Sequence, residues 1–286
     1  MQRFADSLVV RSHPNRVVGR RAFSLVEMLV VISILGLLAA LTVPALKNLN
    51  KSNLSISASR QLLDDAGRAR QMAIANRTYV YMVFVPTNFW SNINFNKLTP
   101  AQQTLITNLI PMQLSGYAMV SYGKLGDQPG RHSWKYLTDW KSLPENSYLA
   151  PFKFVLTGQP TRYTVGSDND VTVYQFDRTN GIPFPTEDTD PLANYPALPY
   201  IAFDYTGQLI SSYFDTDRAG NGAVLPLVQG QVAYGYNGTT KQPVLTAVNP
   251  SDISEVPAGN STNIAYNLIH VDPLTGRAAQ QFFKLK

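Results

Sequence analysis

A long apolar run lies near the N-terminus of the chain. Residues 28–46, MLVVISILGLLAALTVPAL, contain no charged side chain. Such a run is long enough to cross the hydrocarbon core of a bilayer as a helix, so it predicts a membrane span. Arginines precede the run, and the positive-inside rule then places the N-terminal end in the cytoplasm and everything after Lys47 outside it.

A helical pattern continues beyond the apolar run. Between residues 46 and 77, small and apolar side chains recur at the spacing of a helix face that packs on a core. This stripe consists of Leu62, Ala66, Ala69 and Ala73. Pro44 cannot donate a hydrogen bond to the carbonyl four residues earlier, so it predicts a kink. We therefore expect one long helix. Its first half is packed in a membrane or filament, and its second half is docked on a globular domain.

The rest of the chain has the pattern of an antiparallel β domain. Residues 78–86, TYVYMVFVP, form a β-branched and aromatic run that ends at a proline. Residues 199–211 predict a hairpin that turns at Thr206-Gly207, and residues 267–283 predict a closing hairpin that turns at Leu274–Gly276. The order of elements predicts an α+β fold, with a long N-terminal helix packed on antiparallel sheets.

Two segments interrupt this β pattern. Residues 87–137 have the character of an insertion, with a short helix at Pro100–Leu109 and a strand around Tyr117–Tyr122. Residues 179–198 contain several prolines and predict a loop over the sheet. We expect the insertion to provide a surface for a specific partner.

The charge of the chain is concentrated at its N-terminus. The 286 residues carry a formal net charge of +5, but residues 1–22 hold five arginines and one aspartate. The remainder has 19 basic and 18 acidic side chains, so it is close to neutral. Near the end of the predicted helix, Arg68, Arg70 and Arg77 lie close to Asp64 and Asp65, which favours a solvated helix face. A general basic surface for nucleic acid is not indicated.

The residues just before the apolar run carry a more specific pattern. Arg20-Arg21-Ala22-Phe23-Ser24-Leu25-Val26-Glu27 leads directly into the run, with Gly36 in its middle and Pro44 near its far end. This pattern resembles the signal of type IV prepilins and type II secretion pseudopilins. The resemblance implies a pilin-like fold with a basic leader (1–22), a transmembrane and filament-core helix (23–46) and an extracytoplasmic body (47–286). In this division the helix continues over 47–77, and 78–286 is β-rich.

The resemblance also implies how the N-terminus is processed. A prepilin peptidase cuts between Ala22 and Phe23, and the new amine of Phe23 is N-methylated. The family usually has glycine before the cut, where this chain has Ala22. The implied partners are other pilin or pseudopilin subunits, the prepilin peptidase, the lipid bilayer and an inner-membrane assembly platform. The subunit is then a single-pass protein of the bacterial inner membrane, which later joins a periplasmic or surface filament.

Glu27 is the one charge between Phe23 and Leu46. A carboxylate at the centre of a membrane helix costs about 2.5–3.5 kcal/mol on insertion scales, so it needs a partner. The free amine of a cleaved Phe23, in the same subunit or in the next one, supplies that partner. We expect this pair to set the axial register of packed helices.

Hydropathy alone leaves two other interpretations of the N-terminus. One is an ordinary signal anchor, in which Glu27 is a tolerated interfacial charge. The other is a secretory signal that is cut after the small residues Val43 and Ala45. The Phe-Ser-Leu-Val-Glu junction, together with Gly36 and Pro44, favours the prepilin interpretation.

The body of the chain resembles one subclass of this family. The segment RARQMAIANR, residues 68–77, leads from the helix into the strand as in H-type minor pseudopilins. TDWKSLPENSYL, residues 138–149, is similar to that subclass's lead-in to a later strand. The implied function is a minor structural subunit of a type II secretion pseudopilus or a type IV pilus-like filament. The alternative is a binding subunit at a pilus tip, either an adhesin or a DNA-uptake receptor.

No pattern in the sequence indicates an enzyme or a cofactor. The chain has no cysteine and no phosphate-binding loop, and His132 and His270 stand apart from any catalytic triad pattern. Residues 215–220, DTDRAG, resemble the start of a calcium loop through Asp215 and Asp217. The twelfth position of such a loop needs a bidentate glutamate, where this chain has Pro226, so we favour a solvated turn.

Overall fold

The structure is a computed structural model in which part of the chain is described. The described residues are 24–123, 126–127, 133–155, 161–165, 169–179, 181–210, 222–240, 244, 252–256, 258–259, 261 and 268–281, with side chains for all of these except 41–55, 92, 161–165 and 169–172. The predicted leader and cut site, which include Ala22 and Phe23, lie outside this part, as do His132, Asp215 and Asp217. The chain forms two compact units, Met1–Leu49 and Asn50–Lys286.

The predicted N-terminal helix is one continuous element. Helix α1 runs from Leu25 to Asn76 and passes through Pro44 without interruption. It ends where Arg77 takes a left-handed φ of 50° and the amides of Arg77 and Thr78 donate to carbonyls of the preceding turn, at 3.3 and 3.2 Å. This pair of hydrogen bonds around a left-handed residue is a Schellman motif, which terminates a helix. The chain then enters strand β1 (Tyr79–Phe84) directly.

The larger sheet is antiparallel and is built around β1. Its strands follow the order β10-β9-β1-β2-β3, with β4 beside β2 and β8 beside β9. The remaining strands are β2 (Gly116–Tyr122), β3 (Trp134–Tyr136), β4 (Lys141–Ser142), β8 (Asp177–Thr179), β9 (Leu198–Phe203) and β10 (Leu209–Ile210). In the register of the three central strands, Met82 lies opposite Met119 on one side and Ile201 on the other.

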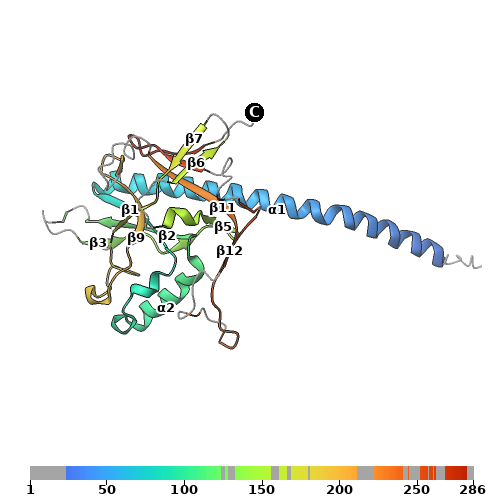
Figure 1. Cartoon of the computed structure of the whole chain (residues 1–286), viewed down its shortest axis with the longest axis horizontal. Coiled ribbons are helices and arrows are strands. Elements are labelled where there is room, and N and C mark those ends of the chain that lie inside the picture. The colour runs from blue at the N-terminus through green and yellow to red at the C-terminus, as the bar shows by residue number, and fades with distance from the viewer. Residues whose placement is uncertain are drawn as a thin grey trace, which may run out of the picture. The chain divides into compact units, whose positions relative to one another are not determined.

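The two faces of this sheet serve two different cores. Alternate side chains of β1, such as Val80 and Met82, pack on the buried stripe of α1, while Val83 packs on the opposite side. This alternation is the period of a strand that is buried on both faces. Within the body, α2 (Pro100–Leu109) and the second part of α1 lie on opposite sides of β1, β2 and β9 (Figure 1).

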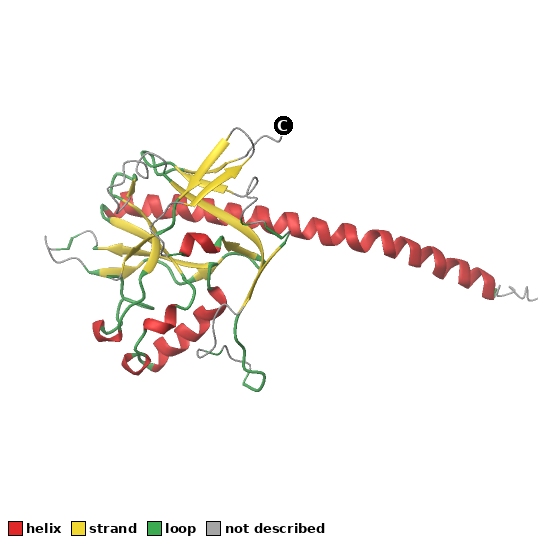
Figure 2. Cartoon of the chain, in the orientation of Figure 1, coloured by secondary structure: helices red, strands yellow, loops and turns green. Residues whose placement is uncertain are grey.

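A second antiparallel sheet completes the core on the α1 side. Its order is β12-β11-β13-β14, with β5 also beside β11. Figure 2 shows the strands in yellow and the helices in red. These strands are β5 (Ser147–Leu149), β11 (Ala223–Ala233), β12 (Asp252–Glu255), β13 (Leu268–Val271) and β14 (Ala278–Gln281). A separate pair is formed by β6 (Thr161–Val165) and β7 (Asn169–Val173). Buried side chains of β5, β11 and β13 join the core that contains the α1 stripe.

Helix α2 is fixed by its own first turn. Thr99 caps it through a reciprocal pair of hydrogen bonds with Gln102, and Pro100 occupies the first helical position. The short 3-10 helices are η1 (Phe89–Asn92), η2 (Phe95–Lys97), η3 (Ile110–Met112), η4 (Pro151–Phe154) and η5 (Pro191–Ala193). Buried residues of α2, η1 and the loop before β9 form the second core.

Most local predictions agree with this architecture. The chain is α+β with antiparallel sheets and a long N-terminal helix, and α2 has the predicted bounds. The hairpins β9–β10 and β13–β14 turn at the predicted positions. The range 87–137 contributes more than an isolated appendage would, because it includes β2, which pairs with β1 along its length. Residues 181–197 lie between β8 and β9 and contribute Ile182 and Phe184 to the second core.

Candidate functional site

The N-terminal end of α1 is capped by a serine. The Ser24 hydroxyl accepts a hydrogen bond of 3.1 Å from the amide of Glu27, and the Ser24 carbonyl accepts one of 3.1 Å from the amide of Met28. These bonds satisfy donors that a helix start leaves open. Glu27 then lies in the first turn, where the helix dipole favours a negative charge. This role of Ser24 was not predicted from the sequence, although Ser-x-x-Glu before an apolar run is a recognised capping pattern.

The first turns of α1 expose apolar side chains on every side. All described side chains from Ser24 to Ala40 are exposed, and the large apolar ones range from 44% exposed at Val31 to 82% at Leu25. The exposed set is Leu25, Val26, Met28, Leu29, Val30, Val31, Ile32, Ile34, Leu35, Leu37 and Leu38. A contiguous apolar surface of this kind marks a site of membrane or protein contact.

The one described hydroxyl inside this apolar surface is satisfied within the helix. Ser33 donates a hydrogen bond of 2.8 Å to the carbonyl of Leu29, one turn earlier. A polar group that is already bonded costs less to bury, so Ser33 does not oppose transfer of the helix into an apolar environment.

The predicted membrane span is not confirmed by the structure. Among the described residues, no helix is long and apolar enough to cross a membrane. The described side chains of the predicted span, residues 28–46, end at Ala40.

The structure describes the surroundings of Gly36 but not the side chain of Pro44. A Cβ atom added at Gly36 would meet no atom within 4 Å, so the glycine leaves an open notch on the side of α1. The side chain of Pro44 lies outside the described side chains, and its kink stays a prediction.

Glu27 is available for a partner outside the described chain. Its side chain is exposed, and it forms no ion pair with any residue that the structure describes. The Phe23 amine, its predicted partner, lies outside the described residues. The register pair therefore stays a prediction.

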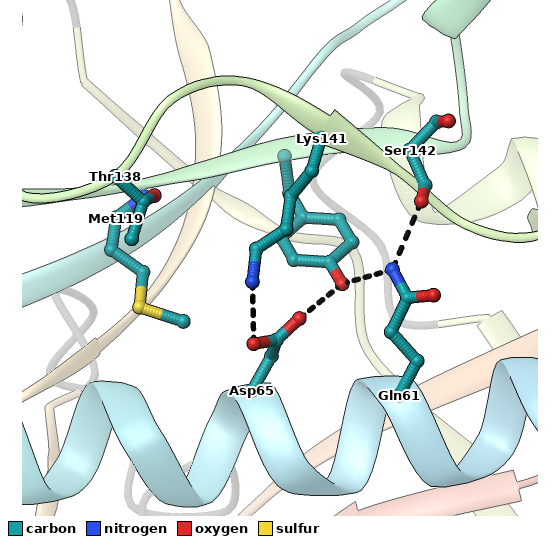
Figure 3. A network of polar contacts seen from close by, with 7 residues as sticks. Gln61, Asp65, Met119, Thr138, Lys141 and Ser142 are labelled. Atoms are coloured by element: carbon teal, nitrogen blue, oxygen red, sulfur yellow. Dashed lines mark hydrogen bonds and ion pairs between the residues drawn. The ribbon is translucent and has the colours of Figure 1, made fainter.

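A polar network fixes the second part of α1 to the body (Figure 3). The Tyr117 hydroxyl donates a hydrogen bond of 2.5 Å to Asp65, and Lys141 Nζ lies 2.6 Å from the other oxygen of the same carboxylate. The Gln61 amide donates to the Tyr117 hydroxyl at 2.8 Å and to the Ser142 carbonyl at 2.9 Å. Four side chains from α1, β2 and β4 are therefore linked by hydrogen bonds and an ion pair where the helix crosses the sheet.

This network corrects one sequence-based prediction. Asp65 was expected on a solvated helix face, but it is 7% exposed and paired with Lys141. Burial, followed by the hydrogen bond with Asp65, raises the pKa of Tyr117 far above its usual value. The proton therefore stays on Tyr117, which acts as a donor to the carboxylate.

Arg70 binds two turns of the body. Its Nε donates to the carbonyls of Gly207 and Thr275, at 3.2 and 2.6 Å. A Cβ atom at Gly276 would lie 2.0 Å from the Gly207 carbonyl oxygen, so the turns of the β9–β10 and β13–β14 hairpins touch through their glycines. Arg70 is therefore partly buried and bonded to the backbone of the body, where the sequence predicts a fully solvated helix face.

Other candidate chemistry receives little support from the described part of the chain. Within it, no three His, Asp or Glu side chains are grouped so as to hold a metal ion. His270 lies within β13, opposite Val224 of β11 and Ala279 of β14. Trp134 packs on Tyr81 and Tyr122, so part of the aromatic content fills the second core.

Comparison with known proteins places one motif on this chain. Residues 19–43 match the family model described as the prokaryotic N-terminal methylation motif. The match covers the predicted cut site, Glu27, Gly36 and the whole exposed apolar surface of residues 25–38, so the N-terminus is a type IV prepilin-like signal. No curated protein and no solved structure matches the chain.

Proposed function

We propose that this chain, which carries a prepilin-type methylation motif at residues 19–43, is a structural subunit of a type II secretion pseudopilus or a type IV pilus-like filament. The observation that carries the proposal is the coincidence of this motif with the exposed apolar surface of residues 25–38. Removing apolar surface from water is favourable by about 25 cal/mol per Å². Contact of this surface with a bilayer or with other apolar helices is therefore more favourable than its exposure to water.

Assembly requires processing of the N-terminus. In this proposal a prepilin peptidase cuts between Ala22 and Phe23, and the new amine is methylated. Ser24 then lies at the second position of the mature chain, where its cap starts the helix immediately. Before assembly the first part of α1 anchors the subunit as a single pass in the inner membrane, with the body outside the cytoplasm.

Glu27 and Gly36 have complementary roles in this assembly. Glu27 pairs with the Phe23 amine of its own or a neighbouring subunit, which cancels two charges in an apolar environment. The notch at Gly36 lets another helix approach closely, as small residues do in packed membrane helices. Together they define the axial position of one helix against the next.

A minor position in the filament is supported by the resemblance of residues 68–77 and 138–149 to H-type pseudopilins. The body also contains a second core, which suits a specialised subunit. In this role the chain is not an enzyme, and its partners are other pilin-type subunits and the inner-membrane assembly platform.

Photo-crosslinking tests the proposal directly. We would place p-benzoylphenylalanine at Leu35, which is 59% exposed, and irradiate cells that assemble the filament. The proposal predicts a crosslink to another protein that has an N-terminal methylation motif. The same probe at Ser91, on the exposed surface of the body, is the matched control. Crosslinks only to lipid, or equal patterns from both positions, would contradict the proposal.

The alternative of a DNA receptor at a pilus tip has less support. Arg70 is already bound to two carbonyls, and the chain after residue 22 is close to neutral. Binding of the full chain to immobilised DNA, measured as salt rises, separates the two functions because phosphate contacts give a steep salt dependence. Strong binding that salt abolishes would favour the receptor.

A further inference from the structure

An open groove lies on the body beside α2. It has a volume of about 650 Å³, within the range of ligand-binding clefts. Three segments form it: the C-terminal half of α2 with the following η3, residues 136–140 from the end of β3 to just before β4, and the loop of residues 185–188. This groove belongs to none of the features that the N-terminal motif explains.

The groove is acidic. Asp139, Glu187 and Asp188 line it, and its described lining residues include no lysine or arginine. All three side chains are exposed, and none forms an ion pair with a residue in the described ranges. The Glu187 carboxylate accepts a hydrogen bond of 2.7 Å from the amide of Tyr136, which holds its charge at the wall of the groove.

Aromatic and aliphatic side chains lie beside these carboxylates. Tyr136 and Trp140 line the groove, with ring centroids 5.8 Å apart. Leu105, Met112 and Leu137 are partly exposed along the same lining. Aromatic faces attract cations, and the attraction adds to that of nearby carboxylates. A ligand that combines a cation with apolar groups therefore fits the groove, because the carboxylates and aromatic rings attract the cation and the aliphatic side chains contact the apolar groups.

Hydrogen bonds make the groove rigid before any ligand arrives. Trp140 Nε1 donates to the Pro185 carbonyl and the Tyr136 hydroxyl to the Pro183 carbonyl, both at 2.9 Å. From α2, the Gln102 amide donates to the hydroxyls of Thr186 and Thr189, at 3.3 and 3.4 Å. A site that is already ordered loses less entropy on binding, so this rigidity favours recognition.

We propose that this groove docks a segment of a different protein subunit that presents a lysine or arginine beside apolar side chains. Charge complementarity selects the basic residue, and the partly exposed aliphatic side chains receive its neighbours. The groove's volume of about 650 Å³ is larger than one cation needs, which favours a peptide segment over a small cation. The inference concerns the body alone and holds whether or not residues 24–40 pack in a filament.

The test places p-benzoylphenylalanine at Asn108, an exposed residue in the groove lining, in the full chain within its native membranes. Mass spectrometry of the irradiated sample identifies the crosslinked peptide. The proposal predicts a segment of another protein with a lysine or arginine within about four residues of the crosslink. It also predicts that the double variant Asp139→Asn/Asp188→Asn lowers the yield about tenfold, because two attractive charges are lost.

A matched control removes one charge without touching the groove. Asp190 is exposed in the same loop but does not line the groove, and its oxygen caps η5 by accepting from the Leu192 amide at 2.8 Å. Asp190→Asn keeps that acceptor and should leave the yield unchanged. All variants must keep the thermal unfolding midpoint of the parent.

Several results would overturn the proposal. They are the absence of any crosslinked protein, a crosslink to a second copy of this chain, a partner segment without a basic residue, and equal yields in the groove and control variants.

Discussion

The Tyr117 hydroxyl lies 2.5 Å from the buried carboxylate of Asp65, which joins the central strand β2 to α1. The two residues are 52 positions apart in the chain. Since Lys141 reaches the same carboxylate, the buried charge of Asp65 is compensated as well as hydrogen-bonded. This relationship ties the second part of α1, around Asp65, to strands β2 and β4 of the body.

Removal of the Tyr117 hydroxyl should destabilise the body. In Tyr117→Phe, Asp65 loses one donor and Gln61 loses one acceptor, so we expect the free energy of unfolding to fall by about 1–3 kcal/mol. Chemical denaturation of the full chain in detergent measures the change. Tyr205→Phe is the control, because Tyr205 is 56% exposed. A loss no larger than that of the control would mean that the network contributes nothing to stability.

The contact between the two hairpin turns should not tolerate a methyl group. Gly276 has a φ of 61°, and a Cβ atom there would lie 2.0 Å from the Gly207 oxygen. We expect Gly276→Ala to cost about 2 kcal/mol or more, through both the clash and the backbone conformation. Gly238→Ala is the control, since a Cβ atom there meets nothing within 4 Å. Thermal unfolding midpoints of the two variants measure the difference, and equal midpoints would contradict this contact between the turns.

The body should lose stability in strong alkali. Burial, and then the nearby Tyr200, raises the pKa of Tyr81 from 10.0 to about 12. The folded state therefore holds this proton more tightly than the unfolded chain does. Its contribution is complete below pH 10.0 and is lost as the pH rises through about 12. Tyrosinate absorbance followed together with unfolding measures this, and Tyr81→Phe should shrink the loss. A stability that is flat across this range would refute the prediction.

Gly36 should matter for assembly and not for folding. The surroundings of Gly36 are open in the single chain, so Gly36→Leu should leave the unfolding of the body unchanged. In packed helices the added side chain blocks close approach, and we expect filament yield to fall roughly tenfold. Gly36→Ala adds a much smaller side chain, so its filament yield should lie between that of the parent and that of Gly36→Leu. Normal filament yield from Gly36→Leu would remove the proposed packing role.

Local sequence patterns predicted the helices, strands and turns of this protein well, but they did not predict its long-range contacts. The stripe of Leu62, Ala66, Ala69 and Ala73 is fully buried, because a helix face that packs on a sheet needs that spacing. The turns at Gly207 and Gly276 were visible because glycine suits positive φ. Each of these signals lies within a few consecutive residues.

The roles of Asp65 and Arg70 depended on partners far away in the sequence. Asp65 meets Lys141 across 76 positions, and Arg70 meets Thr275 across 205. Charge patterning along one helix cannot show such partners, so both residues looked solvated. The acidic groove was hidden for the same reason, because its carboxylates belong to two segments that the fold brings together.

The N-terminal residue and mass of the protein in its native membranes test the central claim most directly. Intact-mass and N-terminal peptide spectra should show a chain that begins at N-methylated Phe23, with the leader through Ala22 removed. That result would establish prepilin processing at the motif of residues 19–43. A chain that still begins at Met1, or one that begins after Ala45, would contradict the assembly mechanism.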